Sequence, residues 1–114
     1  MRVSSVVLAA TIAAAYNMPA SAAMRITSDR GGQIGPYLDK LQSLQRSGQS
    51  VIIDGPCFST CTMVLGVVPH DRICVTSRAV LGFHAAWRPD RAGRQISAED
   101  GTSFFMSLYP QQVR

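Results

Sequence analysis

The chain has 114 residues, of which eleven are Lys or Arg and seven are Asp or Glu, and it has a formal net charge of +4. This length allows a single domain. The basic residues are scattered and are not interleaved with aromatic residues, which argues against a nucleic-acid-binding protein.

The first 22 residues have the pattern of a signal peptide. Met1-Arg2 is a basic start, residues 6–15 are apolar and rich in alanine, and Ala20-Ser21-Ala22 has the small-x-small form of a cleavage site. The alternative is an uncleaved anchor, but this apolar run is short for crossing a bilayer. We therefore expect removal of residues 1–22. We also expect one periplasmic or secreted domain over 23–114, with no stable membrane span after cleavage.

Short strands and helices are predicted to alternate, which is typical of an α/β fold. We expect a strand at 24–27, then a turn and an amphipathic helix. This helix is predicted from apolar residues at helical spacing, with Pro36 in its first turn and Gly48 just past its end. Its apolar positions are Ile34, Tyr37, Leu38, Leu41 and Leu44.

The second half of the domain continues the alternation. A buried strand at 51–54 ends at Gly-Pro, and a short buried helix over 60–68 has Ser59 at its N-cap. Strands are expected at 72–76 and 79–84, followed by a polar loop over 88–95. Residues 97–100 resemble a capping box with Asp in place of Glu. They precede a helix over 102–109 that buries Phe104, Phe105 and Leu108 and is stopped by Pro110.

Ser59 and His84 have the residue types needed for nucleophilic catalysis. A serine hydroxyl becomes an effective nucleophile when a neighbouring imidazole takes its proton. Ser59 is expected on a tight turn between a strand and a helix, and His84 at the end of a later strand. Unpaired N–H groups at the start of that helix favour a developing oxyanion. Each residue also has a structural interpretation: Ser59 as a helix N-cap, and His84 as a core histidine bonded to a carbonyl. His70 is expected in a surface loop.

Three blocks of sequence occur in an order and spacing typical of a known family. They are Ile26–Gly32 (ITSDRGG) before a helix, Gly55–Ser59 (GPCFS) opening a helix, and Arg72–His84 (RICVTSRAVLGFH). Together they resemble the proteolytic subunit of the Clp protease and its exported relatives in the ClpP/crotonase superfamily. The resemblance implies an α/β fold of ββα units, present here in part, with the C-terminal part of the fold missing.

The resemblance also implies roles for individual residues. Ser59 would be the nucleophile and His84 the general base, with the backbone N–H groups of Gly32 and Thr60 as oxyanion donors. The Gly31-Gly32 turn taken alone is more typical of an ordinary turn. The implied substrate is a peptide or protein, with no cofactor and no metal.

The third member of a catalytic triad is not evident. A carboxylate normally orients the histidine, and in the Clp-type proteases it lies beyond the point where this chain stops. The acids after His84 are Asp90, Glu99 and Asp100, and none matches the family position. Lys40 is the sole lysine and gives little support to a serine–lysine dyad. We therefore expect weak or no peptidase activity.

Two functions of different classes stay open. The first is an exported serine-peptidase-like protein, and the second is a non-catalytic periplasmic domain that keeps the fold for binding or assembly. A homo-oligomer is compatible with either. A crotonase-type enzyme acting on coenzyme A thioesters is disfavoured by export, because that cofactor is cytosolic.

Three cysteines in an exported chain favour a disulfide. Cys57 and Cys61 flank Ser59 at minus two and plus two, and Cys74 lies on the next predicted strand. The sequence leaves the connectivity open, and we expect Cys74 to bond with one of the other two. A Cys57–Cys74 bridge would close a loop of about 18 residues and contribute roughly 3 kcal/mol. Reduced thiols and, least favoured, a metal site are the alternatives.

Three arginines lie close together after His84, at positions 88, 91 and 94. The sequence is compatible with a solvated loop, which is the more common use of such residues, or with contact to an acidic partner.

Overall fold

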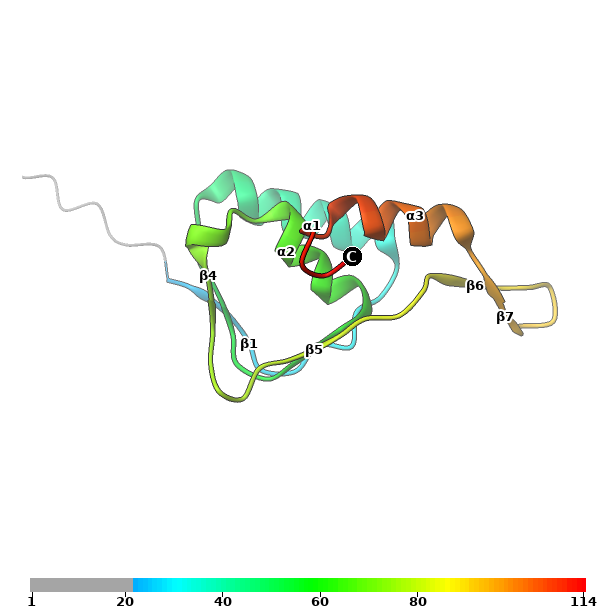
Figure 1. Cartoon of the computed structure of the whole chain (residues 1–114), viewed down its shortest axis with the longest axis horizontal. Helices are drawn as coiled ribbons and strands as arrows, with labels where there is room; N and C mark the ends of the chain where they lie inside the picture. Colours follow the sequence, from blue (N-terminus) through cyan, green and yellow to red (C-terminus); the bar gives the residue numbers. More distant parts are fainter. Residues whose placement is uncertain (1–21) are drawn as a thin grey trace, which may run out of the picture.

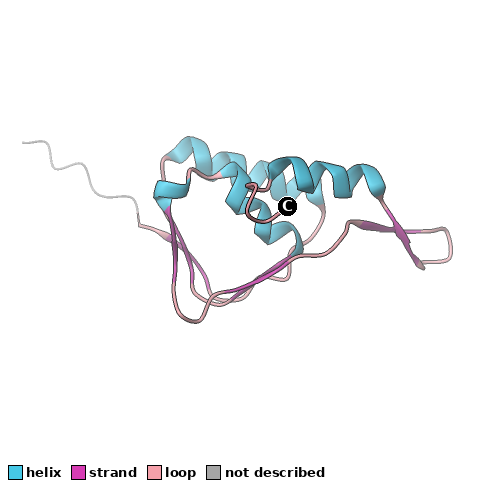
Figure 2. Ribbon diagram, in the orientation of Figure 1, coloured by secondary structure: helices cyan, strands magenta, loops and turns pink. Residues whose placement is uncertain are grey.

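The computed structural model describes residues 22–114 (Figure 1). The predicted signal peptide therefore lies outside the described residues, apart from Ala22. Helices and short strands alternate along the described part, and Figure 2 shows the helices gathered on one side of the strands. The α/β prediction is confirmed at this level. Within residues 22–114, none of the helices has the length and apolar character needed to cross a membrane.

The strands nearest the core form two small parallel sheets. The first sheet has the order β1 (Met24–Ile26), β2 (Val51–Ile53), β4 (Ile73–Val75). The second pairs β3 (Pro56–Phe58) with β5 (Val80–Gly82), and Asp29 adds an isolated parallel bridge to Cys57. The chain thus passes from the first sheet to the second after β1, after β2 and after β4.

A helical segment follows each passage between the sheets. The segments are α1 (Ile34–Ser47), then η1 (Ser59–Met63) with α2 (Val64–Val67), and finally α3 (Glu99–Leu108). A further short turn, η2 (His70–Arg72), leads into β4. The predicted first helix is confirmed with its end at Gly48, whose φ of 73° is the left-handed conformation that glycine accepts readily.

Gly55-Pro56 is predicted to end a strand, but in the structure Pro56 begins one, β3. Pro56 occupies the first position of β3, where the missing N–H removes no ladder bond within the strand. Its carbonyl accepts from the Asp29 N–H at 2.8 Å, and the Phe58 N–H donates to the Asp29 carbonyl at 2.9 Å. Backbone pairing with a distant segment therefore makes this stretch a strand.

The polar loop predicted over 88–95 is also wrong in part, because its ends pair as a hairpin. Strands β6 (Trp87–Pro89) and β7 (Gln95–Ser97) are antiparallel. The Asp90 carboxylate accepts from the N–H groups of Ala92 and Arg94 and so shapes the turn. In Figure 1 this hairpin extends away from the helices and the two parallel sheets.

The predicted capping box at 97–100 does not form. Helix α3 begins at Glu99, earlier than expected, and its N-cap, Ala98, makes no side-chain capping bond. Thr102 secures the start of the helix instead. Its hydroxyl accepts from the Ala86 N–H at 2.9 Å and donates to the Ala98 carbonyl at 3.1 Å.

Apolar residues from both strands and helices fill the core between the two layers. Phe105 of the predicted last helix is buried, whereas Phe104 and Leu108 are only partly so. The fully buried side chains with the largest volumes include Leu41, Val51, Ile53, Met63, Val64 and Val68.

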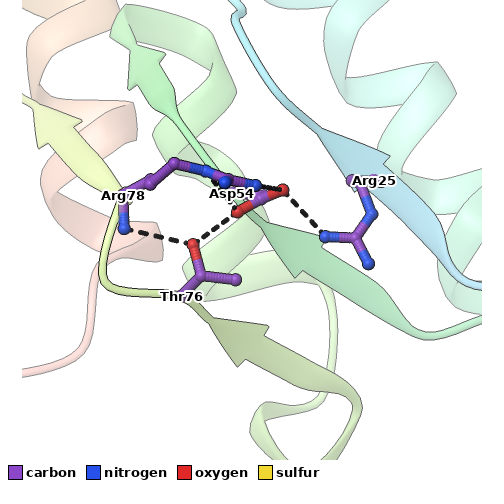
Figure 3. A network of polar contacts seen from close by, with 4 residues as sticks. All are labelled: Arg25, Asp54, Thr76 and Arg78. Carbon is purple, nitrogen blue, oxygen red and sulfur yellow. Dashed lines mark hydrogen bonds and ion pairs between the residues drawn. The ribbon is translucent and has the colours of Figure 1, made fainter.

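The buried carboxylate of Asp54 connects the end of β2 with β1 and with the turn that follows β4. The Asp54 side chain, 2% exposed, follows β2 and accepts from three residues (Figure 3). Arg78 donates through two nitrogens at 2.5 and 3.1 Å, Thr76 at 2.6 Å and Arg25 at 2.8 Å. These hydrogen bonds, that of Arg78 foremost, hold the pKa of Asp54 well below its usual range.

Acid should therefore weaken the wild-type protein through Asp54. Because the folded-state pKa lies below the unfolded value of about 3.9, this stabilisation is complete above about pH 5 and is lost progressively as the pH falls. We expect Asp54→Asn to be less stable than wild type at pH 7 and to lose less further stability between pH 5 and 3. Urea midpoints across this range measure the effect. The exposed Asp71→Asn is the control, and equal slopes for wild type and Asp54→Asn would contradict the role of Asp54.

Gly66 allows α2 to approach α3. A Cβ atom at this position would overlap the carbonyl group of Leu108, whereas a Cβ at Gly35 in α1 would meet nothing within 4 Å. Both glycines lie within helices, where alanine is intrinsically better by about 1 kcal/mol. The two glycines therefore have the same helical setting and differ in whether a side chain would meet a neighbouring helix.

We expect opposite effects from the same substitution at these two positions. Gly66→Ala should lower the free energy of unfolding by about 1–3 kcal/mol because the overlap exceeds the gain in helix propensity. Gly35→Ala should be neutral or raise the free energy of unfolding by up to about 1 kcal/mol. Urea unfolding followed by circular dichroism measures both. A stabilised Gly66→Ala would show that the two helices do not touch at this point.

Candidate functional site

Ser59 lies on the turn between β3 and η1 in an unusual backbone conformation. Its φ is 56°, and it is the only non-glycine residue with positive φ among residues 22–114. For a residue with a Cβ this conformation costs roughly 1–2 kcal/mol and is found mainly where surrounding structure enforces it, often at functional sites. Ser59 is the first residue of η1 and not its N-cap, which is Phe58. The N-cap interpretation of Ser59 is therefore wrong.

A disulfide brackets this turn. Cys57 and Cys61 are bonded, with their Cα atoms 5.3 Å apart, and both are fully buried. The expected bridge from Cys74 to one of them is wrong, because Cys74 is a free, exposed thiol. Cys74 pairs with Ile52 in the first sheet, whereas Cys57 belongs to the second.

A chain of hydroxyl groups holds the Ser59 carbonyl. The Thr62 hydroxyl donates to this carbonyl at 2.6 Å, so the Tyr109 hydroxyl, 2.5 Å from Thr62 Oγ1, must donate to Thr62. Burial raises the pKa of Tyr109, which favours the protonated, donating form. The Tyr109 ring also makes an edge contact with Phe83, at 5.2 Å between centroids. Tyr109 thus connects the Ser59 turn with the residue next to His84.

Ser59 and His84 follow two parallel strands that end at the same edge of the second sheet. Phe58 of β3 pairs with Gly82 of β5 in parallel register. Ser59 lies one residue beyond the first strand, and His84 lies two residues beyond the second. Within the described part, no hydrogen bond joins the Ser59 hydroxyl to the His84 ring.

The His84 ring has a defined tautomer. Its Nδ1 lies 2.7 Å from the Ala85 carbonyl oxygen, and a carbonyl only accepts, so Nδ1 carries a proton. In the neutral ring Nε2 then has the free lone pair that a general base requires. His84 is exposed, which rules out the core interpretation, although the carbonyl bond expected with it is present. His70 is exposed as predicted.

The Gly31-Gly32 turn covers the start of η1. Asp29 fixes it, accepting from the Gly31 N–H at 2.8 Å and from the Tyr37 hydroxyl at 2.6 Å. A Cβ on Gly31, whose φ is 83°, would lie 2.7 Å from Thr60 Oγ1 and 2.8 Å from Thr60 N. This close contact and the positive φ both require glycine.

Of the two predicted oxyanion donors, one is already hydrogen-bonded and the other is buried in this arrangement. The Gly32 N–H donates to the Thr60 hydroxyl at 2.7 Å, and Thr60 as a whole is 1% exposed. The oxygen of a ligand would reach both N–H groups only if the Gly31-Gly32 turn separated from Thr60.

The acidic residues after His84 have other partners or positions. Asp90 shapes the hairpin turn and forms an ion pair with Arg94 at 2.8 Å, and these bonds lower the pKa of Asp90. Glu99 and Asp100 are exposed in the first turn of α3, where negative charge is favoured by the helix dipole. Lys40 lies 3.7 Å from the Asp29 carboxylate. Residues 22–114 contain no cluster of three or more His, Cys, Asp or Glu placed to hold a metal.

Two hollows border His84. One is open, has a volume of ≈ 470 Å³ and lies between His84 and the hairpin residues Trp87 and Ile96. The other, of ≈ 190 Å³, is lined by aromatic and aliphatic side chains that include Phe83 and Phe105. An apolar group of a ligand bound in either hollow would lie beside the imidazole.

No protein-family model, curated protein or solved structure matches the chain. The resemblance to the ClpP/crotonase superfamily and the roles carried over from it therefore stay predictions.

Several residues that shape the site had no recognisable sequence signal. Asp29 is part of the block Ile26–Gly32 that resembles the family. Its pairing with Cys57 of β3 joins segments far apart in the sequence, and the block did not predict that pairing. Thr62 and Tyr109 are 47 positions apart, so no local pattern connects them. Their contribution follows from tertiary contacts alone.

The cysteine pairing gives a direct test. Alkylation of the native protein should label Cys74 only, and alkylation after reduction in denaturant should label all three cysteines. Cys57→Ser/Cys61→Ser should lower the free energy of unfolding by about 2 kcal/mol, the chain-entropy value for so short a loop. Peptide mass spectrometry and urea unfolding provide the measurements, with Cys74→Ser as the control. Three labelled thiols in the native protein would contradict the pairing.

Proposed function

We propose that this chain is an exported serine-hydrolase-like protein in which Ser59 is the nucleophile and His84 the general base. The observation that carries the proposal is the backbone of Ser59, strained and fixed between two bonded cysteines on a strand-to-helix turn. This geometry presents the serine at the edge of the sheet where His84 also leaves its strand. A strained turn of this kind is also how α/β hydrolases expose a nucleophilic serine.

The order of elements supports a fold of the ClpP/crotonase type. Each unit contributes a segment to the first sheet, a segment to the second and then a helix. This corresponds to the ββα units implied by the sequence resemblance. On this proposal the substrate is a peptide or protein, and the compartment is periplasmic or extracellular, where a buried disulfide persists.

The proposed chemistry is acyl transfer. Ser59 Oγ attacks the substrate carbonyl carbon while its proton passes to Nε2 of His84, and the carbonyl oxygen becomes an oxyanion. When the intermediate collapses, the bond to the leaving group breaks and His84 returns the proton to that group. Water then attacks the acyl-serine by the same route and regenerates Ser59.

Two features predict that this chemistry is slow. The Ala85 carbonyl, and not a carboxylate, accepts from Nδ1 of His84, so within residues 22–114 no carboxylate is bonded to the imidazolium formed in the reaction. Replacing the orienting carboxylate of a triad lowers turnover by about four orders of magnitude. The oxyanion donors are also engaged or covered until the Gly31-Gly32 turn moves.

The second candidate is a non-catalytic binding or assembly domain. The specific observation that favours it is the bond from Gly32 N–H to the Thr60 hydroxyl, which satisfies the donor without a substrate. In that case the Ser59 turn is structural and its hydroxyl has no chemical role.

Reaction with a fluorophosphonate probe distinguishes the two functions. We expect slow labelling at Ser59 that is abolished in Ser59→Ala and reduced at least about 100-fold in His84→Ala, the usual range for loss of a general base. Ser77→Ala changes an exposed turn serine and should label as wild type does. Mass spectrometry locates the adduct. Equal background in wild type and Ser59→Ala would establish the non-catalytic alternative.

A further inference from the structure

Strand β4 is an outer strand of the first sheet, and its far side is open within the described part of the chain. The sheet order is β1, β2, β4, so β2 alone lies beside β4. Proteins usually protect such an edge with charged residues or proline. The other outer strand, β1, has Arg25, whereas β4 consists of Ile73, Cys74 and Val75. An apolar edge without this protection is a template for pairing with another strand.

The free backbone groups of this edge belong to Val75 and Ile73. The Thr76 N–H donates to the Ile53 carbonyl at 3.0 Å. Successive residues of a paired strand direct their bonding groups to opposite sides, so Val75 presents its N–H and its carbonyl to the open side. The Ile73 N–H donates to the His70 carbonyl, which leaves the Ile73 carbonyl free. The edge therefore offers one donor and two acceptors.

Val75 also leaves apolar side-chain surface in water. It pairs in register with Ile53, whose side chain is fully buried. Register partners point to the same face of a sheet, so Val75 lies on the core side. It is nevertheless 62% exposed, the highest value among the exposed large apolar residues of 22–114. A further strand beside β4 would cover this side chain.

We propose that β4 pairs antiparallel with β4 of a second copy, about a two-fold axis at Cys74. This register places Val75 opposite the partner's Ile73, so the Val75 N–H donates to the Ile73 carbonyl on each side of the axis. The two three-stranded sheets then join edge to edge. The contact is isologous, because the same residues serve both copies. The proposal concerns assembly and does not depend on the hydrolase chemistry of Ser59.

The charged residues near the axis permit this pairing. Arg72 donates to the Gln45 carbonyl at the end of α1, and Arg78 is paired with the buried carboxylate of Asp54. Like charges directly opposite each other would destabilise an antiparallel pair. In the extended two-fold register none meet: Asp71 is opposite Ser77, Arg72 opposite Thr76, and Arg78 opposite His70.

The axis brings two free thiols together. Cys74 is exposed and unbonded, and it lies directly opposite the partner's Cys74. Its own backbone groups face β2, so the two cysteines form a non-hydrogen-bonded pair, with Cα atoms about 4.5 Å apart. Disulfides span Cα distances of about 4.4–6.8 Å. Glutathione disulfide should therefore trap the dimer, taking two electrons and two protons from the thiols to leave one S–S bond and two glutathione thiols.

Disulfide trapping of the full chain tests the register. With glutathione disulfide, the wild type should form a dimer linked through Cys74. Cys74→Ser/Ser77→Cys also has an exposed thiol, but position 77 lies opposite Asp71 and not opposite itself. It should link at least about tenfold more slowly, since its thiols are not held together. Non-reducing electrophoresis and peptide mass spectrometry measure both rates, and equal rates would overturn the pairing.

Sedimentation of Cys74→Ser tests the association without a covalent link. A short edge buries less than a standard interface, so we expect a monomer–dimer equilibrium between about 1 μM and 1 mM. In this background Val75→Lys should weaken dimerisation at least about tenfold, because it places a charge in the contact. Ile96→Lys makes the same change at an exposed apolar residue of the hairpin and should dimerise as Cys74→Ser does. Circular dichroism checks that both variants are folded.

Two results of this sedimentation experiment would overturn the proposal. A monomer over the whole concentration range would leave the β4 edge to a strand of another protein. Loss of the dimer in Ile96→Lys, with Val75→Lys unaffected, would assign the contact between copies to the hairpin.

Discussion

The buried carboxylate of Asp54 fixes the geometry on which the candidate site depends. It lies where the chain leaves the first sheet towards β3, and it bonds to Thr76 and Arg78 where the chain leaves the same sheet towards β5. A carboxylate removed from water must have donors, and this one has them from three residues in two segments, β1 and the turn after β4. The starts of β3 and β5 are thereby held in register, and Ser59 and His84 follow directly from the ends of these strands.

The strain at Ser59 is opposed by interactions of similar size. A left-handed serine costs roughly 1–2 kcal/mol, whereas a short disulfide loop contributes about 2 kcal/mol and a buried hydrogen bond about 1 kcal/mol. The Cys57–Cys61 bridge and the bonds from Tyr109 through Thr62 to the Ser59 carbonyl act on the same turn. The conformation is therefore set by its surroundings, which is the condition under which such strain persists.

The two sides of the site differ in accessibility. On the η1 side, Gly31 packs against Thr60, and the N–H groups proposed for an oxyanion are engaged or covered. On the β5 side, His84 is exposed between two hollows, one of which extends to the hairpin. A ligand therefore reaches the imidazole first and the oxyanion donors only after a backbone movement.

The sequence alone determined the elements whose signals are local. Helix α1 followed from apolar spacing and from Gly48 at its end, and β2 from a short apolar run. Only the tertiary structure decided the Cys57–Cys61 pairing, the strand at Pro56, the hairpin within the predicted loop and the burial of Thr60. Each of these depends on which distant segments meet. Helical periodicity and turn chemistry act over a few residues, whereas strand pairing and burial are set by partners far along the chain, which a single sequence does not specify.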